Sequence, residues 1–287
     1  MKLLLVFLWM LFYPSSAIAE AVACRQDSLR ISIIPVKNID ELVREYQPLA
    51  DMLSAGLDLP VQILRASSYA SVIDATVSGG TDIALLGPAS YLLAWQQNPR
   101  IEAFASLALG AGYFSTGGGY YHSLLLVRGD SEFRTLEDTR GRRVVLNDPA
   151  STSGALVPNR EFPASAGRPL DAHFAGQIYA GSHDKALDAL LQGRVEAAFV
   201  SSERADEYLR RGLIDEKSLR VLWRSAPIHY DPFVFSAEVC PLLKERIRSL
   251  MHTPSAQVSE FLRSQRAERI IPVSHAAYQP LLELMAR

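Results

Sequence analysis

Three consecutive hydroxyl residues, Ser151-Thr152-Ser153, followed by Gly154, are the residues of this sequence best suited to hold a small anion. They come soon after an expected strand and Pro149, where a helix should begin. Backbone N–H groups in the first turn of a helix lack intrahelical partners, and the helix dipole favours an anion there. An ordinary helix N-cap needs only one hydroxyl. The turn therefore predicts either a helix cap or an oxyanion site whose hydroxyls donate without adding charge.

His183 is a second residue able to contact an anion. It lies where a strand is expected to end and a helix to begin, near the carboxyl edge at which α/β sheets place ligands. Its imidazole can donate to an anion's oxygen, and a bound anion favours the protonated ring. The alternative is a surface histidine that caps a helix.

Nucleophilic catalysis by Ser151 or Ser153 with His183 is the rival chemistry. No Gly-x-Ser-x-Gly elbow surrounds either serine, and no acid that would orient the histidine is evident. The six histidines of the chain show no metal-ligand spacing, and there is no P-loop. We therefore expect no catalytic residue, no metal and no cofactor.

Two lobes of alternating strands and helices are expected to position these residues, which makes the fold class α/β. The expected strands are Leu29–Pro35, Val61–Leu64, Asp82–Leu86, Arg142–Leu146, Gln177–Tyr179 and Val195–Val200. The expected helices are Ile39–Leu57, Tyr69–Val77, one that begins at Ser151, Lys185–Leu191 and an amphipathic C-terminal helix over Pro241–Leu262. Residues 73–84 and 187–198 share a pattern of helix, glycine, acid and apolar strand, which indicates related βα units in the two lobes.

Two extended stretches, Tyr120–Val127 and Val221–Phe235, are expected to cross between the lobes as a hinge. On this interpretation lobe 1 is discontinuous and comprises residues 20–122 and 232–287. Residues 123–231 form lobe 2. In each lobe we expect a mainly parallel sheet flanked by helices.

The N-terminus is typical of an export signal. Lys2 is followed by the apolar run Leu3–Tyr13 and by Ala17-Ile18-Ala19, a small-x-small cleavage pattern. The run is too short to span a bilayer comfortably. Residues 1–19 are therefore predicted to be a signal peptide, with the mature protein in the periplasm or an equivalent exported space.

The two cysteines of the chain, Cys24 and Cys240, are predicted to pair, because an even number in an oxidising compartment favours a disulfide. Two alternatives stay open. Cys24 follows a loose lipoprotein-like run, Ala21-Val22-Ala23, and would then carry a lipid anchor; or both thiols are unpaired.

The composition and net charge limit which classes of binding partner are expected. The 287 residues are 48% hydrophobic and 21% charged, as in an ordinary globular protein. The formal net charge of -2 gives no long-range attraction to nucleic acid or an anionic membrane. A bound anion must therefore be held by local geometry, and nucleic acid is not expected as a partner.

Four runs with a common order and spacing carry a family resemblance over roughly residues 30–250. They are Asp82–Tyr91, Tyr121–Ser123, Asp148–Gly154 and Ala180–Asp184. With these runs the sequence resembles the phosphate/phosphite/phosphonate-binding proteins of ABC transporters, a subgroup of periplasmic binding proteins. The resemblance implies a two-lobed, Venus-flytrap fold with two hinge crossings.

The resemblance also implies roles for individual residues. Ser151, Thr152, Ser153 and His183 would hold the oxyanion, with Tyr69 facing them from lobe 1. A further binding tyrosine is Tyr121, or Tyr120 if the register differs by one residue.

Family members that bind aminoalkyl phosphonates hold the ammonium group with two carboxylates, which match Glu203 and Asp231 here. A helix-start acid and a turn acid are the alternative interpretation of these two. Arg204 stands next to Glu203 and would weaken an ammonium site if it neutralised that acid.

The function implied is that of an exported, monomeric receptor that captures a phosphonate, phosphite, phosphate or related oxyanion between its lobes. It would deliver this ligand to a membrane permease of an ABC transporter. An oxyanion sensor that signals to a partner is the first alternative, and the serine hydrolase using Ser151 and His183 is the second.

Overall fold

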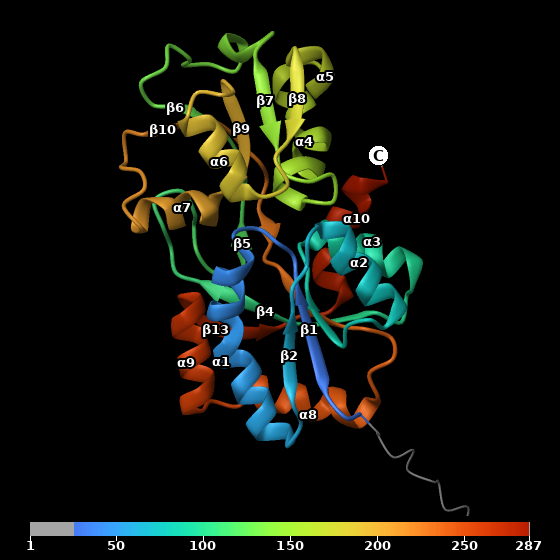
Figure 1. Cartoon of the computed structure of the whole chain (residues 1–287). Helices are drawn as coiled ribbons and strands as arrows, with labels where there is room; N and C mark the ends of the chain where they lie inside the picture. Colours follow the sequence, from blue (N-terminus) through green and yellow to red (C-terminus); the bar gives the residue numbers. More distant parts are fainter. Residues whose placement is uncertain (1–25, 287) are drawn as a thin grey trace, which may run out of the picture.

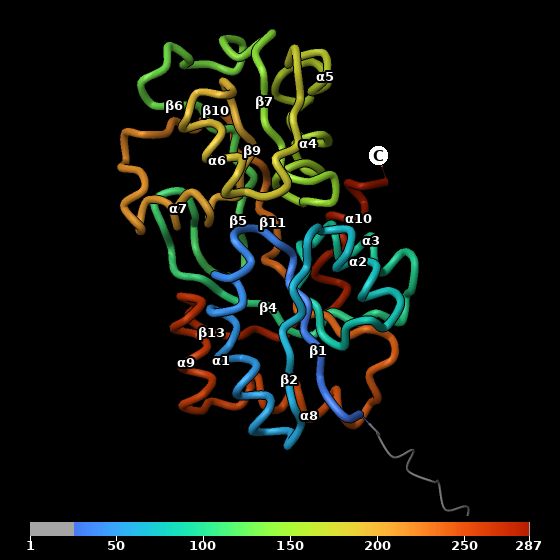
Figure 2. Tube along the Cα trace, viewed as in Figure 1, coloured from blue at the N-terminus to red at the C-terminus, as the bar shows by residue number. Residues whose placement is uncertain are grey.

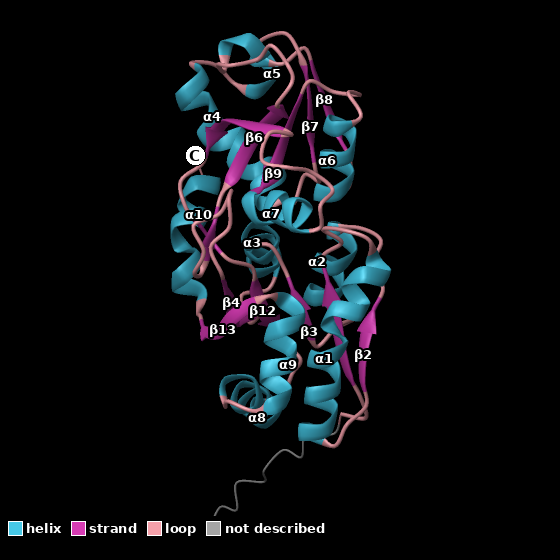
Figure 3. Ribbon diagram, turned by 90° about the vertical axis from the view of Figure 1, so that its left-hand side faces the viewer, coloured by secondary structure: helices cyan, strands magenta, loops and turns pink. Residues whose placement is uncertain are grey.

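The computed structural model describes residues 26–286, which form two α/β lobes stacked end to end (Figure 1). The signal peptide predicted at 1–19 and Cys24 lie outside the described residues. The view turned by 90° shows helices on both sides of the sheets in each lobe (Figure 3). The predicted α/β class and two-lobed architecture are therefore confirmed. Within residues 26–286, no helix combines the length and apolar character needed to cross a bilayer.

Lobe 1 is built on a six-stranded sheet. In sheet order its strands are β13 (Ala267–Pro272), β4 (Glu102–Leu109), β12 (Pro232–Phe235), β3 (Ile83–Leu85), β1 (Leu29–Ile33) and β2 (Val61–Leu64). Its helices are α1 (Ile39–Leu57), α2 (Tyr69–Ser78), α3 (Pro88–Gln97), α8 (Pro241–His252) and α9 (Ala256–Gln265). Along β12, Phe233 and Phe235 enter the apolar cluster under α1, α8 and α9, whereas Val234 enters the cluster under α2 and α3. This alternation is the period of two that a strand buried on both faces requires.

Lobe 2 is built on a five-stranded sheet. Its strands in order are β10 (Leu219–Arg224), β6 (Ser123–Arg128), β9 (Ala197–Ser201), β7 (Arg143–Leu146) and β8 (Gly176–Tyr179). Its helices are α4 (Val157–Ala166), α5 (Leu170–His173), α6 (His183–Leu191) and α7 (Ser202–Arg210), with short helical turns η1 (Glu137–Thr139) and η2 (Thr152–Leu156).

Both sheets are mixed, which corrects the expectation of mainly parallel sheets. β1 and β7 each pair in parallel with two neighbours, but β6, β10, β12 and β13 pair antiparallel to theirs. The chain enters and leaves lobe 2 through the hinge, and a strand that returns through a hinge must run opposite to the one that entered.

The hinge is a two-stranded ribbon between the lobes, where β5 (Tyr120–Tyr121) pairs with β11 (Ile228–His229). The chain trace shows both crossings at the waist of the molecule (Figure 2). Gly117 and Gly118 precede β5 with φ angles of 75°, a conformation that favours glycine. A loop from β4 also enters lobe 2, since Phe114 belongs to the apolar cluster of that lobe.

Local signals explain the elements that were predicted with the correct ends. α1 begins after Asn38, whose side chain accepts from the N–H groups of Asp40 and Glu41, and it ends at Asp58 with φ 57°.

The C-terminal helix expected over 241–262 is instead two helices, α8 and α9. Pro254 separates them because it offers no N–H, and Ser255 then caps α9.

The chain ends in η3 (His275–Tyr278) and α10 (Gln279–Met285), which lie against both lobes. Leu281 packs on the α2/α3 cluster of lobe 1 and also on an apolar cluster of lobe 2. The last helix therefore bridges the lobes behind the hinge.

Candidate ligand-binding site

The Ser151 turn lies between β7 and α4, and its three hydroxyl residues are buried. Residues 152–156 form a π-helical turn, in which Leu156 N donates to Ser151 O at 2.9 Å, before α4 begins. Such wide turns are common at functional sites. Ser151 Oγ accepts from Gly154 N at 3.1 Å, so this serine does act as a helix cap. The hydroxyls of Thr152 and Ser153 exceed what that cap needs.

Position 154 must be a glycine because a neighbouring side chain occupies the space that a Cβ atom would fill. A Cβ atom at this position would lie 1.9 Å from Asn147 Nδ2. Asn147 N also donates to Gly154 O at 3.2 Å. A glycine at this position therefore makes room for the side chain of Asn147.

Lobe 1 touches the turn directly through the start of α3. Ala89 N donates to Thr152 Oγ1 at 2.9 Å, and Ser90 Oγ donates to Ala150 O at 2.8 Å. Gly87 gives the close approach, because a Cβ atom there would lie 3.0 Å from Thr152 Oγ1. The lobes are therefore in the closed arrangement.

Tyr69 reaches the same place from lobe 1. It is the first residue of α2, which Ser68 and Ser71 fix through a reciprocal capping box. Its buried hydroxyl lies near Ser151 and has no hydrogen-bond partner among the described residues. Burial is the main cause that raises the pKa of Tyr69, and the negative charge of Asp231 is the second. The phenol therefore keeps its proton and can donate a hydrogen bond.

Tyr120 and Tyr121 point to different sides of the hinge. Tyr121 is 3% exposed, whereas Tyr120 is 51% exposed and packs beside His229. The Tyr121 hydroxyl lies close to those of Thr152 and Ser153. Burial is the main cause that raises the pKa of this hydroxyl, and the negative charge of Asp231 is the second. Tyr121 therefore joins the turn and Tyr120 does not.

His183 is buried inside lobe 2 as the first residue of α6. Its Nδ1 accepts from Ser201 N at 3.2 Å, and Asn147 Nδ2 lies 2.6 Å from the same atom. Burial, and then Arg204, lower the pKa of His183 to about 3. The surrounding protein therefore favours the neutral ring, and the protonation that a bound anion would favour stays a prediction. Among the described residues no hydrogen bond joins Ser151 Oγ to His183, whose Nδ1 accepts from Ser201 N instead.

Glu203 and Asp231 come together beside Tyr121. Burial raises the pKa of Glu203 to about 7, and burial and then Glu203 raise the pKa of Asp231 well above its usual range. Glu203 Oε2 is buried without a hydrogen-bond partner in the described part of the chain. Arg204 Nη2 instead pairs with Asp184 Oδ1 at 2.6 Å. The adjacent arginine therefore does not form an ion pair with Glu203.

A cavity of about 100 Å³ opens between the lobes next to these acids. Its lining includes Glu203, Asp231 and Tyr230, together with Tyr46 of α1. Sequence reasoning missed Tyr46, Tyr230 and Asn147. The position of Tyr230 beside Asp231 was the one local signal, and nothing near Tyr46 or Asn147 marks them.

Cys240 is disulfide-bonded, at the start of α8. Its pairing with Cys24 stays a prediction, because Cys24 lies outside the residues that the structure describes.

Two α/β lobes joined by a paired hinge, with hydroxyls of both lobes meeting between them, define a two-lobed periplasmic binding protein. A comparison with protein families narrows this class. Residues 31–278 match the family described as "ABC transporter, phosphonate, periplasmic substrate-binding protein", and the chain belongs to this family. The recognition made from the sequence motifs is thereby confirmed, and the family implies a periplasmic location.

Two curated relatives are similar in sequence over most of the chain. The "Phosphate-import protein PhnD" of Mycolicibacterium smegmatis is 27% identical, over 92% of this chain and 86% of the relative. The "Phosphonates-binding periplasmic protein" of Escherichia coli is 28% identical, over 83% of this chain and 69% of the relative.

Solved structures show the same fold. A binding protein component of an ABC phosphonate transporter from Pseudomonas aeruginosa superposes with a TM-score of 0.80 at 23% identity, over 91% of this chain and 86% of that one. PhnD1 from Prochlorococcus marinus, in complex with methylphosphonate, superposes with a TM-score of 0.77 at 19% identity, over 90% of this chain and 97% of that one.

Proposed function

We propose that this protein captures a small phosphonate between its lobes and delivers it to the permease of an ABC transporter. The observation that carries the proposal is the meeting of hydroxyl donors from both lobes at the Ser151 turn. Ser153, Tyr69 and Tyr121 offer hydroxyls there, and the first turn of the helix offers backbone N–H groups. A tetrahedral oxyanion has enough acceptors to engage several of these donors at once.

The carboxyl pair favours a phosphonate that carries an ammonium group. Glu203 and Asp231 lie beside the anion-binding turn, and both have raised pKa values, which means that the ionised pair is unfavourable without a cation. An ammonium group on the ligand supplies that cation. Phosphate has no such group, so 2-aminoethylphosphonate should bind more tightly than phosphate.

Ligand binding and closure are coupled, because the donors come from both lobes. A ligand that contacts both lobes binds the closed form better than the open form and raises its population. The permease would then recognise the closed form, with the protein acting as a monomer.

Calorimetric titration of the ligand-stripped protein with 2-aminoethylphosphonate, methylphosphonate, phosphite and phosphate tests this function. We expect binding of both phosphonates, with 2-aminoethylphosphonate the tighter. A folded sample that binds none of the four would refute the proposal. Tighter binding of phosphate than of either phosphonate would reassign the protein to phosphate import.

A further inference from the structure

The cavity between the lobes carries a second set of charges that phosphonate and ammonium recognition leaves unused. Besides Glu203 and Asp231, it is lined by Lys37 of lobe 1 and Arg204 of lobe 2. Four further charged residues line the same cavity of about 100 Å³. Glu45 pairs with Lys37, and Glu207 pairs with Arg210 and Arg266. A single water molecule needs about 10–15 Å³ of such a cavity, so this cavity has room for several heavy atoms.

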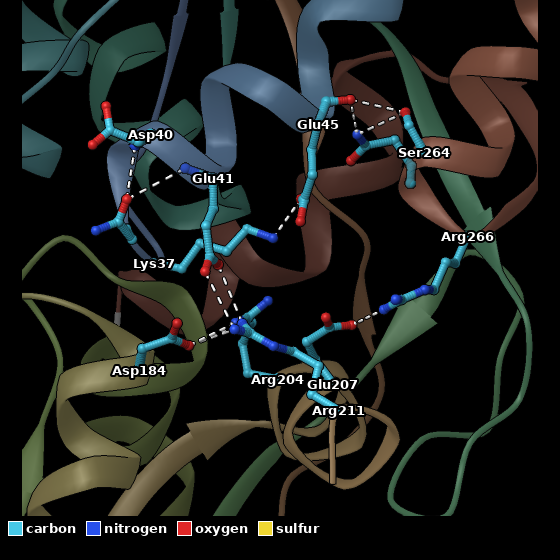
Figure 4. Close-up of polar contacts among 12 residues, drawn as sticks. Lys37, Asp40, Glu41, Glu45, Asp184, Arg204, Glu207, Arg211, Ser264 and Arg266 are labelled. Carbon is cyan, nitrogen blue, oxygen red and sulfur yellow. Dashed lines mark hydrogen bonds and ion pairs between the residues drawn. The ribbon is translucent and has the colours of Figure 1, made fainter. Parts of the chain in front are cut away.

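Lys37 and Arg204 are both buried, at 8% and 7% exposure. Lys37 follows β1, and Arg204 lies in the first turn of α7, so the two cations approach from opposite lobes (Figure 4). Burial, and then the charge of Arg204, lower the pKa of Lys37. Two like charges brought together by lobe closure repel each other, and an anion between them would remove that repulsion.

Each cation is oriented by an acid of its own lobe and still has donors to offer. Lys37 Nζ pairs with Glu45, which uses one of the three ammonium donors. Arg204 binds Asp184 Oδ1 through Nε and Nη2, at 3.1 and 2.6 Å, whereas a guanidinium group has five N–H donors. Glu45 and Asp184 therefore hold the cations in place without exhausting them.

We propose that Lys37 and Arg204 form a carboxylate subsite, and that the preferred ligand is an amino acid bearing a phosphonate. The inference rests on the proposed function, because it assumes a phosphonate at the Ser151 turn and an ammonium group between Glu203 and Asp231. The α-carboxylate of such a ligand is bonded to the same carbon as its ammonium group, and Lys37 and Arg204 line the cavity that these groups would occupy. Glu203 and Asp231 form no ion pair in the described part of the chain, and Lys37 and Arg204 keep donors beyond those that Glu45 and Asp184 engage. These four groups of the cavity therefore complement the ammonium and carboxylate of an α-amino acid.

Titration of the wild-type protein with 2-aminoethylphosphonate and with 2-amino-3-phosphonopropionate is the decisive comparison, because these ligands differ by one carboxylate. We expect the carboxylated ligand to bind at least about 10-fold tighter, the size of one hydrogen bond between charged groups. Equal or weaker binding of the carboxylated ligand, with 2-aminoethylphosphonate still bound, would overturn the subsite and leave the proposed function intact. If neither ligand binds, the carboxylate subsite and the ammonium site both fall, and the titration with methylphosphonate then decides the proposed function.

The Lys37→Met variant assigns the effect to this side chain. It should bind 2-amino-3-phosphonopropionate at least about 10-fold more weakly and 2-aminoethylphosphonate within about threefold of wild type. Lys217→Met, on the exposed side of lobe 2, is the matched control and should change neither affinity. An equal loss for both ligands would show that Lys37 only supports the fold. Thermal unfolding of each variant checks folding, and the wild-type comparison decides the question even if Lys37→Met does not fold.

Discussion

Ala89 in lobe 1 donates its backbone N–H to the hydroxyl of Thr152 in lobe 2, at 2.9 Å. Thr152 belongs to the hydroxyl turn that was singled out in the sequence, and Ala89 lies in the first turn of α3. This hydrogen bond joins the proposed anion site to lobe closure, so a change at Thr152 should alter both.

Thr152→Val removes the acceptor of this bond and keeps the shape of the side chain. We expect phosphonate affinity to fall by about 1–3 kcal/mol, because the closed form loses an interlobe hydrogen bond and the ligand loses a donor. Titration calorimetry gives the affinity, and small-angle scattering of the liganded protein shows whether the lobes still close. Thr253→Val, at an exposed position in lobe 1, should leave both unchanged. An unchanged affinity for Thr152→Val would contradict the coupling.

Ser151→Ala should have two separable effects. Its hydroxyl caps the helical turn through Gly154 N, so the free energy of unfolding should fall by about 1 kcal/mol. If the hydroxyl also contacts the ligand, binding should weaken by about 1.5–3 kcal/mol. Urea unfolding without ligand measures the first effect, and calorimetry measures the second.

Ser255→Ala is the matched control, since Ser255 caps α9 by accepting from Val258 N at 3.0 Å. It should lower stability by a similar amount and leave binding unchanged. Equal effects of the two substitutions on binding would mean that Ser151 is only a cap.

The carboxyl pair predicts that the ligand-free protein loses stability as the pH rises. The pKa of Glu203 is raised from 4.5 to about 7, so the folded state holds a proton that the unfolded state has already released between these pH values. Stability therefore falls through this window, by roughly 2–3 kcal/mol for this group. Glu203→Gln cannot titrate and should flatten the profile. Urea unfolding at intervals from pH 4.5 to 8 tests this, and a wild-type profile as flat as that of the variant would refute it.

Ion pairs across the mouth of the cleft should add a salt-dependent contribution to closure. Arg211 of lobe 2 binds Glu41 of lobe 1 through Nη1 and Nη2, both at 3.2 Å, and Arg266 of lobe 1 pairs with Glu207 of lobe 2 (Figure 4). Because the Arg211 pair is partly exposed, Arg211→Gln should weaken ligand binding by only about 0.5–1 kcal/mol at low salt.

Screening should reduce this loss, so the affinities of wild type and Arg211→Gln should converge at high salt. Titration at low and high sodium chloride concentration measures the difference. Arg65→Gln breaks an exposed ion pair with Asp40 inside lobe 1 and should have no such effect. An equal loss in both variants would show that the interlobe position is irrelevant.

Several parts of the fold could be read from local sequence because local interactions decide them. The ends of α1 follow from Asn38 and Gly56-Leu57-Asp58, and the start of α2 follows from Ser68. Strands β4 and β13 were not predicted. The apolar part of β4, Ala103–Leu109, is rich in alanine and lacks the alternation of a half-buried strand.

The class of protein, the two lobes and the hydroxyl turn were predictable because they depend on short-range patterns and on the order of motifs along the chain. Which side chains share the site depends instead on how the two lobes pack. Tyr121 is buried and Tyr120 exposed because only one of two adjacent residues can face the cleft from a strand. Arg204 pairs with Asp184 and not with Glu203, and Lys37 of lobe 1 lies close enough to Arg204 of lobe 2 for that charge to lower its pKa. Such contacts join residues far apart in the chain, so no local pattern records them.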